Sequence, residues 1–182
     1  WRLLENGSEN GTFGIVAASG PNAALPHATP TGRKLQRGDF LLIDFGAIYE
    51  GWYSDISRTF AIGCAGEDMR RIYQLVRQAG DTAIAAMADG VSAAAVDEAA
   101  RCVIRQGGYG AYFGHGLGHG VGLDIHEKPR LRPESKDVLR AGNIVTVEPG
   151  IYLPDRFGVR IEDILAVTED GCVDLTSMER DL

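Results

Sequence analysis

The chain has 182 residues, 45% of them hydrophobic and 24% charged, which are ordinary values for a single soluble globular domain with a substantial core. A formal net charge of -7 disfavours nucleic acid and anionic membranes as partners. The three cysteines form no CxxC pair and no apolar run of about 18 residues is present, so we expect a cytoplasmic protein with reduced cysteines.

The first part of the chain is typical of strands separated by a loop. Residues 13–19, 39–49 and 53–62 are rich in β-branched and aromatic side chains, which favour extended structure. Between the first two of these strands, residues 21–32 read PNAALPHATPTG and include three prolines. Proline lacks a backbone N–H and fixes φ, so this stretch predicts a loop.

Two helices are expected next. From residue 67 to residue 87, apolar side chains recur at helical spacing, and two acidic residues occupy the first turn. Ser92 predicts the N-cap of a second helix, which extends to about Gln106 and is stopped by Gly107 and Gly108. The spacing of the apolar residues predicts that both helices pack one face on a core.

The rest of the chain returns to strands, at 143–153 and 158–168, with a short strand at 173–176. The two helices therefore lie between two strand pairs, and each pair carries acidic side chains within apolar runs. This order indicates a coarse two-fold repetition. No helix pair precedes the first strand pair, so either such helices lie upstream or the two halves are not equivalent.

Four carboxylates occupy apolar strand segments: Asp44, Asp55, Glu148 and Glu162. An ionised carboxylate inside a strand is destabilising by several kcal/mol unless a cation compensates it. A single acid of this kind is more often an edge-strand charge that faces solvent, but four in parallel contexts argue against that interpretation. Two divalent ions would neutralise four negative charges, so the set points to a dinuclear metal centre.

The spacing of the two acids in the first acidic hairpin restricts which residues can lie opposite each other. Asp44 and Asp55 are symmetric about residues 49–50, so a tight turn there would place their carboxylates directly opposite each other. Glu50 and Gly51 are the better turn pair, however, and would shift this register. The sequence leaves both registers open, and in either one the two acids stay close together.

The second hairpin repeats the arrangement. Glu148 and Glu162 are symmetric about Asp155, within a turn region that begins at Pro154. Two acidic cross-strand pairs that face each other would form a cage of four carboxylates. Like charges directly opposite on a sheet are destabilising without cations, which again favours a metal site.

Histidines add possible nitrogen ligands and substrate contacts. His119 lies in GHGLGHGVG, where the glycines allow a close backbone approach to a ligand, so we expect it to bind metal. His115 and His126 are candidates for contacting the peptide group of a substrate, or else are surface histidines. His27, within ALPHATP, is isolated, and its simplest interpretation is a loop histidine.

Two further polar residues accompany the second acidic hairpin. Arg160 precedes Glu162 by two residues, so both side chains share one strand face, and the guanidinium could orient the carboxylate or form a cross-strand salt bridge. Tyr152 is either a core aromatic or a hydroxyl of the site.

The order Asp, Asp, His, Glu, Glu resembles the M24 metallopeptidase family from about Gly14 to the C-terminus. It is carried here by IDFGA, SDISRTF, HGLGHGVGLDIHE, TVEPGIY and VRIED. These motifs are closer to those of the Xaa-Pro branch, which comprises Xaa-Pro aminopeptidases and Xaa-Pro dipeptidases (prolidases). Methionine aminopeptidases instead resemble HGDTS at the second Asp and EPM at the first Glu. Creatinase shares the fold but lacks the metal ligands. The resemblance implies an α+β pita-bread fold with pseudo-two-fold symmetry: a curved antiparallel sheet with helices on its outer face.

The resemblance also implies two divalent metal ions, foremost Mn²⁺, with Co²⁺, Zn²⁺ and Fe²⁺ as alternatives. Asp44 would hold one ion, Asp55 and Glu162 would bridge both, and His119 and Glu148 would complete the other. A metal-bridging water or hydroxide would be the nucleophile, and Glu148 would act as the general base. The expected reaction is hydrolysis of the Xaa-Pro bond at the N-terminus of a dipeptide or peptide whose second residue is proline.

The remaining roles follow from the same resemblance. His115, His126 and His27 match histidines that contact substrate or stabilise the tetrahedral intermediate, whereas Arg160 and Tyr152 match residues that support the metal ligands or the substrate site. These five residues complete the predicted site.

Full-length Xaa-Pro enzymes resemble this chain only in their C-terminal part. They carry an N-terminal domain and two catalytic-domain helices before it. We therefore expect residues 1–182 to be the C-terminal catalytic domain, with impaired activity in this fragment and a homodimer in the full-length protein. A methionine aminopeptidase and a non-catalytic pita-bread module that binds peptides or proteins remain as alternatives.

Overall fold

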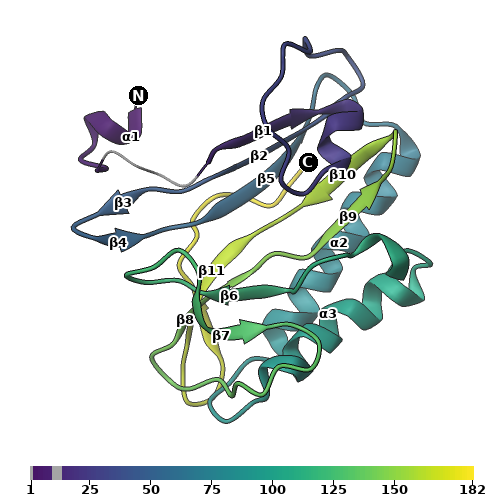
Figure 1. Ribbon diagram of the computed structural model, residues 1–182. Coiled ribbons are helices and arrows are strands. Elements are labelled where there is room, and N and C mark those ends of the chain that lie inside the picture. The colour runs from purple at the N-terminus through teal and green to yellow at the C-terminus, as the bar shows by residue number, and fades with distance from the viewer. Residues whose placement is uncertain (1, 10–13) are drawn as a thin grey trace.

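The first acidic hairpin lies in a three-stranded antiparallel sheet (Figure 1). The computed structural model describes residues 2–9 and 14–182. In spatial order, the strands are β1 (Val16–Ser19), β2 (Phe40–Phe45) and β5 (Ile56–Ala61). Residue 13, the predicted start of the first strand, lies outside the described residues. A short helix, α1 (Arg2–Glu5), precedes this sheet, and one helical turn, η1 (Gly20–Ala24), follows β1.

The tip of this hairpin decides its register. Strands β3 (Ile48–Tyr49) and β4 (Trp52–Tyr53) are joined through Glu50 and Gly51, which have φ values of 50° and 80°. Positive φ at both central residues is the signature of a type I′ turn, in which glycine is unstrained. The same register continues into the sheet, where Asp44 pairs with Ser57.

The directly opposite placement of Asp44 and Asp55 is therefore wrong, and the alternative turn at Glu50 and Gly51 is confirmed. Asp55 lies in the gap between β4 and β5, where strand pairing is interrupted. Both predicted strands, 39–49 and 53–62, are divided at this level of the hairpin.

The second half contains a five-stranded antiparallel sheet. Its strands, in spatial order, are β12 (Cys172–Asp174), β11 (Asp163–Val167), β8 (Ile144–Val147), β6 (Gly118–Gly120) and β7 (Glu127–Leu131). A separate pair, β9 (Gly150–Leu153) and β10 (Phe157–Arg160), continues the β8–β11 hairpin to its turn. The sequence did not predict β6, β7 or α1.

The second hairpin is interrupted at its two acids. Leu153 pairs with Phe157, and Val147 pairs with Asp163, so one register holds on both sides of the interruption and the predicted symmetry of the hairpin is confirmed. At the interruption the backbone N–H of Glu148 donates to Leu117 O at 2.8 Å, and that of Glu162 donates to Ser57 O at 3.1 Å. Both acids are thus tied to segments outside their own hairpin, Glu148 to the residue before β6 and Glu162 to β5.

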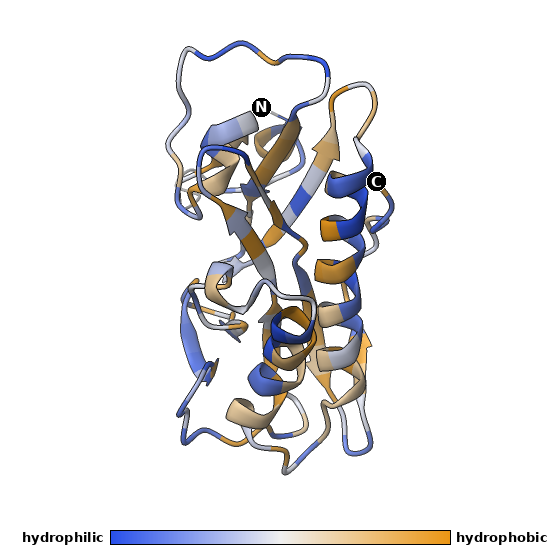
Figure 2. Cartoon of the chain, turned by 90° about the vertical axis from the view of Figure 1, so that its right-hand side faces the viewer, coloured by the Kyte–Doolittle hydropathy of each residue, from blue (hydrophilic) through white to orange (hydrophobic). Residues whose placement is uncertain are grey.

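Two packed helices lie on the same side of the strands (Figure 2). Helix α2 (Glu67–Ala85) ends two residues before the predicted boundary, and α3 (Ala93–Gln106) follows it, with Ser92 at the N-cap but without a side-chain capping bond. Each helix buries one apolar face against the core, as its periodicity predicts. A short turn, η2 (Gly110–Tyr112), then leads toward β6.

The core joins both halves of the molecule. Phe40 of β2 and Phe157 of β10 meet edge to face, with ring centroids 5.3 Å apart, and Tyr73 of α2 packs beside Phe40. The α+β class predicted from the sequence is confirmed. Within the described part of the chain, no helix combines the length and the apolar character that crossing a bilayer requires.

Candidate metal centre

One cavity of about 510 Å³ brings together all five predicted metal ligands. They come from separate elements: Asp44 from the end of β2, Asp55 from the gap after β4, His119 from β6, Glu148 from the gap after β8, and Glu162 from the gap after β10. Three of the five stand at interruptions in strand pairing. A side chain at such a point can turn toward the cavity without breaking a continuous ladder.

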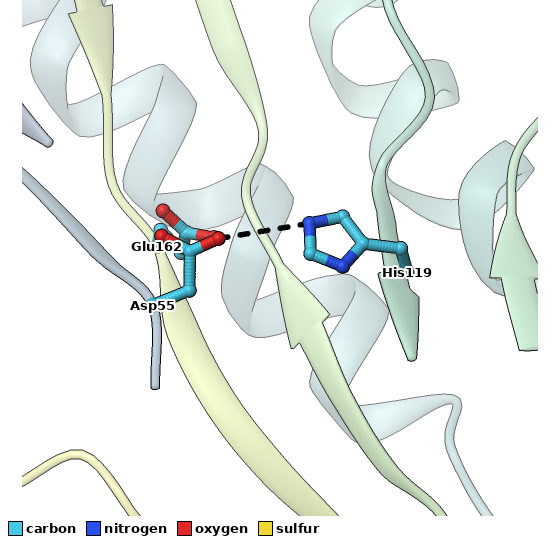
Figure 3. A group of neighbouring side chains, drawn as sticks. All are labelled: Asp55, His119 and Glu162. Atoms are coloured by element: carbon cyan, nitrogen blue, oxygen red, sulfur yellow. Dashed lines mark ion pairs between the residues drawn. The ribbon is translucent and has the colours of Figure 1, made fainter. Parts of the chain in front are cut away.

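Three of these side chains are close enough to share an ion. Ligand atoms of Asp55, His119 and Glu162 all lie within 4.8 Å of one another. Figure 3 shows the two carboxylates side by side, facing the imidazole ring. His119 Nε2 lies 3.7 Å from Asp55 Oδ2 and 3.4 Å from Glu148 Oε1, too far for strong hydrogen bonds. The spacing leaves room for a cation between these atoms.

The imidazole of His119 is oriented as a ligand. Its Nδ1 lies 3.0 Å from Gly120 O and therefore carries the proton, which leaves the Nε2 lone pair directed at the carboxylates. Burial lowers the pKa of His119 to about 4, so the ring is neutral near pH 7. Neutral imidazole is the form that binds metals.

Unpaired oxygens provide a direct test of whether a metal fits. Among the described residues, the buried side-chain atoms without a hydrogen-bond partner are Asp44 Oδ1, Asp55 Oδ1 and Glu162 Oε1. Leaving such a group unpaired is unfavourable by roughly 1–3 kcal/mol, and by more when it is charged. All three atoms belong to this one site, so the donor set fits divalent cations.

Burial and mutual repulsion perturb the acids in the absence of metal. Burial, followed by repulsion from Glu162 and Asp44, raises the pKa of Asp55 to about 9. Burial and the charge of Asp44 raise the pKa of Glu162 to about 7, and burial raises the pKa of Glu148 well above its usual range. The metal-free site therefore retains protons near neutral pH, and bound cations would displace them.

Arg160 supports the acids through hydrogen bonds to one of them and to two neighbouring hydroxyl groups. Its Nη2 donates to Asp44 Oδ2, its Nε donates to Ser57 Oγ at 2.8 Å, and its Nη1 donates to Tyr152 Oη at 2.8 Å. Ser57 Oγ in turn donates to Glu162 Oε2 at 2.7 Å. The guanidinium therefore contacts Asp44 directly and reaches Glu162 through Ser57.

The other predicted histidines line the same cavity. His115 Nε2 accepts from Tyr152 Oη at 2.8 Å, and burial lowers the pKa of His115 to about 4, so this ring is neutral. His126 packs edge to face on His119, with ring centroids 4.3 Å apart. His27 follows Pro26, whose carbonyl accepts from Arg160 Nη1 at 3.1 Å. His27 itself is exposed in a turn, as the loop interpretation predicts, and also lines the cavity.

Three supporting residues were not singled out from the sequence. Ser57 bridges Arg160 and Glu162, while Thr146 Oγ1 accepts from the N–H of His119 and lies 3.4 Å from Glu148 Oε1. Arg58 of β5 is buried, and its Nη2 donates to Asp163 Oδ1 at 2.7 Å. The spacing of two residues between Asp55 and Ser57 within the predicted strand 53–62 was the available signal for Ser57, because such residues share a strand face.

The sequence also matches known proteins. The profile described as Metallopeptidase family M24 covers residues 1–169. The chain belongs to metallopeptidase family M24. A family of metallopeptidases implies divalent metal, in agreement with the donor set of the cavity.

Relatives place this M24 chain near the Xaa-Pro branch. It is 46% identical over 177 residues to the Xaa-Pro dipeptidase of Pyrococcus furiosus, covering 97% of this chain and 51% of that protein. The solved structure of the prolidase from Pyrococcus furiosus gives a TM-score of 0.94 at 44% identity, over 97% of this chain and 52% of that one. The solved structure of the X-Pro aminopeptidase from Thermotoga maritima MSB8 gives a TM-score of 0.94 at 39% identity, over 98% of this chain and 51% of that one.

These likenesses confirm the predicted pita-bread fold and the predicted resemblance to the Xaa-Pro branch. The M24 chain spans about half the length of the curated relatives it matches, 51% in the case of the Pyrococcus furiosus dipeptidase.

Gly118 provides a test of the scaffold beneath this M24 site. A Cβ at this position would lie 2.0 Å from the backbone oxygen of Thr146, on the neighbouring strand. We expect Gly118→Ala to push β6 from β8, to destabilise the chain by about 3 kcal/mol and to weaken divalent-metal binding by His119. Urea unfolding and calorimetric metal titration measure both effects. Gly114→Ala, where no atom lies within 4 Å of the added Cβ, is the control and should change neither quantity.

The perturbed acids predict how the stability of the metal-free M24 chain depends on pH. Raised carboxyl pKa values mean that the folded state binds more protons than the unfolded state, so stability falls as pH rises. The lowered pKa values of His115 and His119 act in the opposite direction, but only below about pH 6.5. Between about pH 7 and pH 9 we therefore expect chelator-treated protein to lose stability in urea unfolding.

Asp55→Asn should reduce this loss, because the amide does not titrate, and saturating metal should reduce it as well. A metal-free stability that rises between about pH 7 and pH 9 would contradict the assignment of protonated acids to this cavity.

Proposed function

We propose that this chain is the catalytic part of a dinuclear metal-dependent peptidase that hydrolyses the Xaa-Pro bond at the N-terminus of dipeptides or peptides. The observation that carries the proposal is the cavity in which five ligand-type side chains converge and three buried carboxylate oxygens lack partners. The likeness to the Xaa-Pro dipeptidase of Pyrococcus furiosus supports the choice of substrate.

We propose the following assignment of the metal-binding residues. Asp44 would hold one ion, His119 and Glu148 would hold the other, and Asp55 and Glu162 would be shared between the two. Four carboxylates and one imidazole suit Mn²⁺, with Co²⁺, Zn²⁺ and Fe²⁺ as alternatives. When bound, two divalent ions supply Lewis-acid chemistry, because they lower the pKa of a water molecule and polarise a peptide carbonyl.

The protein itself handles protons and orients the substrate. Glu148, whose pKa is raised by burial, is proposed to accept the proton from the attacking water and to deliver it to the leaving nitrogen. His115, held by Tyr152, keeps a fixed ring orientation beside the cavity. His126 and His27 line the cavity at its more accessible side and are proposed to donate hydrogen bonds to the substrate peptide group.

The likeness to the X-Pro aminopeptidase from Thermotoga maritima MSB8 favours a second candidate, an aminopeptidase acting on longer peptides. The two candidates share a site and a reaction and differ in substrate length. A methionine aminopeptidase and a metal-free peptide-binding module are retained as outcomes of the experiment below.

We also propose that residues 1–182 form a C-terminal catalytic domain, that the full-length protein is a homodimer, and that it resides in the cytoplasm. The half-length match to the relatives supports the first of these proposals.

The test is an assay of chain that has been stripped with chelator and reloaded with Mn²⁺. Substrates are an Xaa-Pro dipeptide, an Xaa-Pro tripeptide and a peptide that begins with Met-Ala. We expect release of the residue before proline after reloading, at an impaired rate because the chain spans only half of its relatives, and none in the stripped chain. Preference for the tripeptide selects the aminopeptidase, and preference for the Met-Ala peptide selects the methionine aminopeptidase. A chain that binds no divalent metal after reconstitution would instead be a binding module.

A further inference from the structure

A buried arginine joins the metal-ligand hairpins to the segment Met178–Arg180. Arg58 of β5 is 3% exposed. Its five N–H groups have five acceptors: Ser57 O at 3.0 Å and Glu162 O at 2.5 Å from Nη1, Asp163 Oδ1 and Met178 O at 2.7 Å from Nη2, and Glu179 O at 3.1 Å from Nε. The guanidinium has no N–H left over, so it is fixed from both sides.

One side of Arg58 holds the backbone of Glu162. This residue stands where β10 and β11 are interrupted, so its own hairpin does not pair its peptide groups. Its N–H donates to Ser57 O at 3.1 Å, and its carbonyl accepts from Arg58. Both bonds come from the other hairpin, the one that carries Asp55. The position of the Glu162 carboxylate relative to Asp55 therefore depends on where Arg58 lies.

The other side of Arg58 rests on Met178–Arg180, which docks mainly through polar contacts. Arg180 Nε pairs with Asp163 Oδ2 at 2.7 Å, and Tyr73 of α2 donates to Arg180 O at 3.3 Å. Met178 is 44% exposed, so its apolar burial is limited. The chain terminus lies beside α2 (Figure 2), as these contacts require. The segment is therefore held by Arg58, which also holds Glu162, and by Asp163, the residue that follows Glu162.

We propose that Met178–Arg180, acting through Arg58, is a positioning element for the metal centre that sets the spacing between the Glu162 and Asp55 carboxylates. This inference rests on the proposed function, in which both acids bind metal. Without the segment, two N–H groups of Arg58 lose their carbonyl acceptors, and the guanidinium turns toward water to satisfy them. The bond to Glu162 O is then released, and the two carboxylates no longer hold the spacing that a shared ion needs.

The test uses a chain lacking residues 178–182 and an Arg58→Lys variant, whose ammonium has three donors and no planar fork. Mn²⁺ affinity is measured by calorimetry well below the thermal midpoint of each protein. We expect both variants to bind Mn²⁺ about tenfold more weakly or worse, the range seen when groups that support metal ligands are removed. Ile104→Ala, in the fully buried face of α3, is the control: it lowers the thermal midpoint and leaves Mn²⁺ affinity unchanged.

A second measurement needs no metal. Amide hydrogen exchange at Glu162 and Asp163 should accelerate in the metal-free shortened chain, while exchange within α3 stays unchanged. If Mn²⁺ affinity stays within about twofold of the unaltered chain and exchange at Glu162 is unaffected, the segment is only structural and the inference is overturned. If the unaltered chain binds no Mn²⁺, the proposed function fails, whereas the exchange result still decides whether the segment holds Glu162.

Discussion

Replacing Asp55 with asparagine is expected to abolish turnover of Xaa-Pro dipeptides, with a loss in kcat of ~10³-fold or more, about 4 kcal/mol in transition-state stabilisation. Asp55 lies between His119 and Glu162, and one of its oxygens is buried without a partner. The neutral amide removes one of the negative charges that two divalent ions require, and its nitrogen is not a ligand. Steady-state kinetics and metal content of the purified variant measure the two effects.

The matched control is Asp155→Asn. Asp155 lies at the exposed turn of the second hairpin with a φ of 60°, a conformation that asparagine tolerates well. The control should keep its metal and its turnover. If Asp55→Asn retains both as well, Asp55 does not bridge the metals.

Replacing Arg160 with methionine is expected to destabilise the metal-free chain by about 3–5 kcal/mol. The side chain of Arg160 is 3% exposed and pairs with Asp44, whose side chain is 16% exposed. Methionine fills similar space but leaves Asp44, Ser57 and Tyr152 without their donor, so a buried carboxylate loses its compensating charge. Urea unfolding of chelator-treated protein measures the loss, and calorimetry should show weaker Mn²⁺ binding because Asp44 is no longer oriented.

Arg156→Met tests whether burial of the Arg160–Asp44 pair causes the loss of stability in Arg160→Met. Arg156 also pairs with an aspartate, Asp68, but its side chain is 55% exposed. Exposed pairs contribute at most about 1 kcal/mol, so this variant should unfold close to the unaltered chain. Equal losses of unfolding free energy in the two variants would show that burial of the Arg160–Asp44 pair does not determine its contribution to stability.

Element types were largely predictable from the sequence because helical and strand periodicities are strong here. Helix α2 and α3 start where the acidic first turn and Ser92 place them. Register was less predictable. The choice between a turn at Tyr49 and one at Glu50 depends on which residue can adopt positive φ, and the structure shows that Glu50 does so together with Gly51.

Strands β6 and β7 escaped prediction because their residues disfavour strands. Glycines surround His119, and Pro129 lies within β7. The sequence suggested that these glycines let the backbone approach a ligand. The structure gives another reason: a Cβ at Gly118 or Gly120 would lie 2.0 Å or 2.3 Å from the oxygen of a neighbouring strand, at Thr146 or Lys128. Tight strand packing, which only the tertiary structure reveals, requires them.

The five metal ligands could be predicted from the sequence because their residue types and their order along the chain are visible there, and the structure brings all five to one cavity. The groups that support them were harder to find. Arg58 and Ser57 look like ordinary strand residues, and their importance arises from contacts more than 100 positions away in the chain, such as Ser57 to Glu162 and Arg58 to Asp163. Such contacts leave no local periodicity to detect.

The interruptions in strand pairing have a consequence for how this architecture can change. Where strand pairing is interrupted, main-chain hydrogen bonds connect the two halves. Ser57, Thr59 and Arg58 add further bonds between the halves, and none of these three is a proposed metal ligand. Of the proposed metal ligands, Glu162 and Asp44 also bond across the halves through their carboxylates, to Ser57 and Arg160, whereas Asp55 and Glu148 do not take part in these side-chain bonds. A descendant, or a protein engineer, can therefore exchange Asp55 and Glu148 for neutral residues and keep the contacts between the halves, so that the proposed hydrolase becomes a receptor without first having to become a different fold.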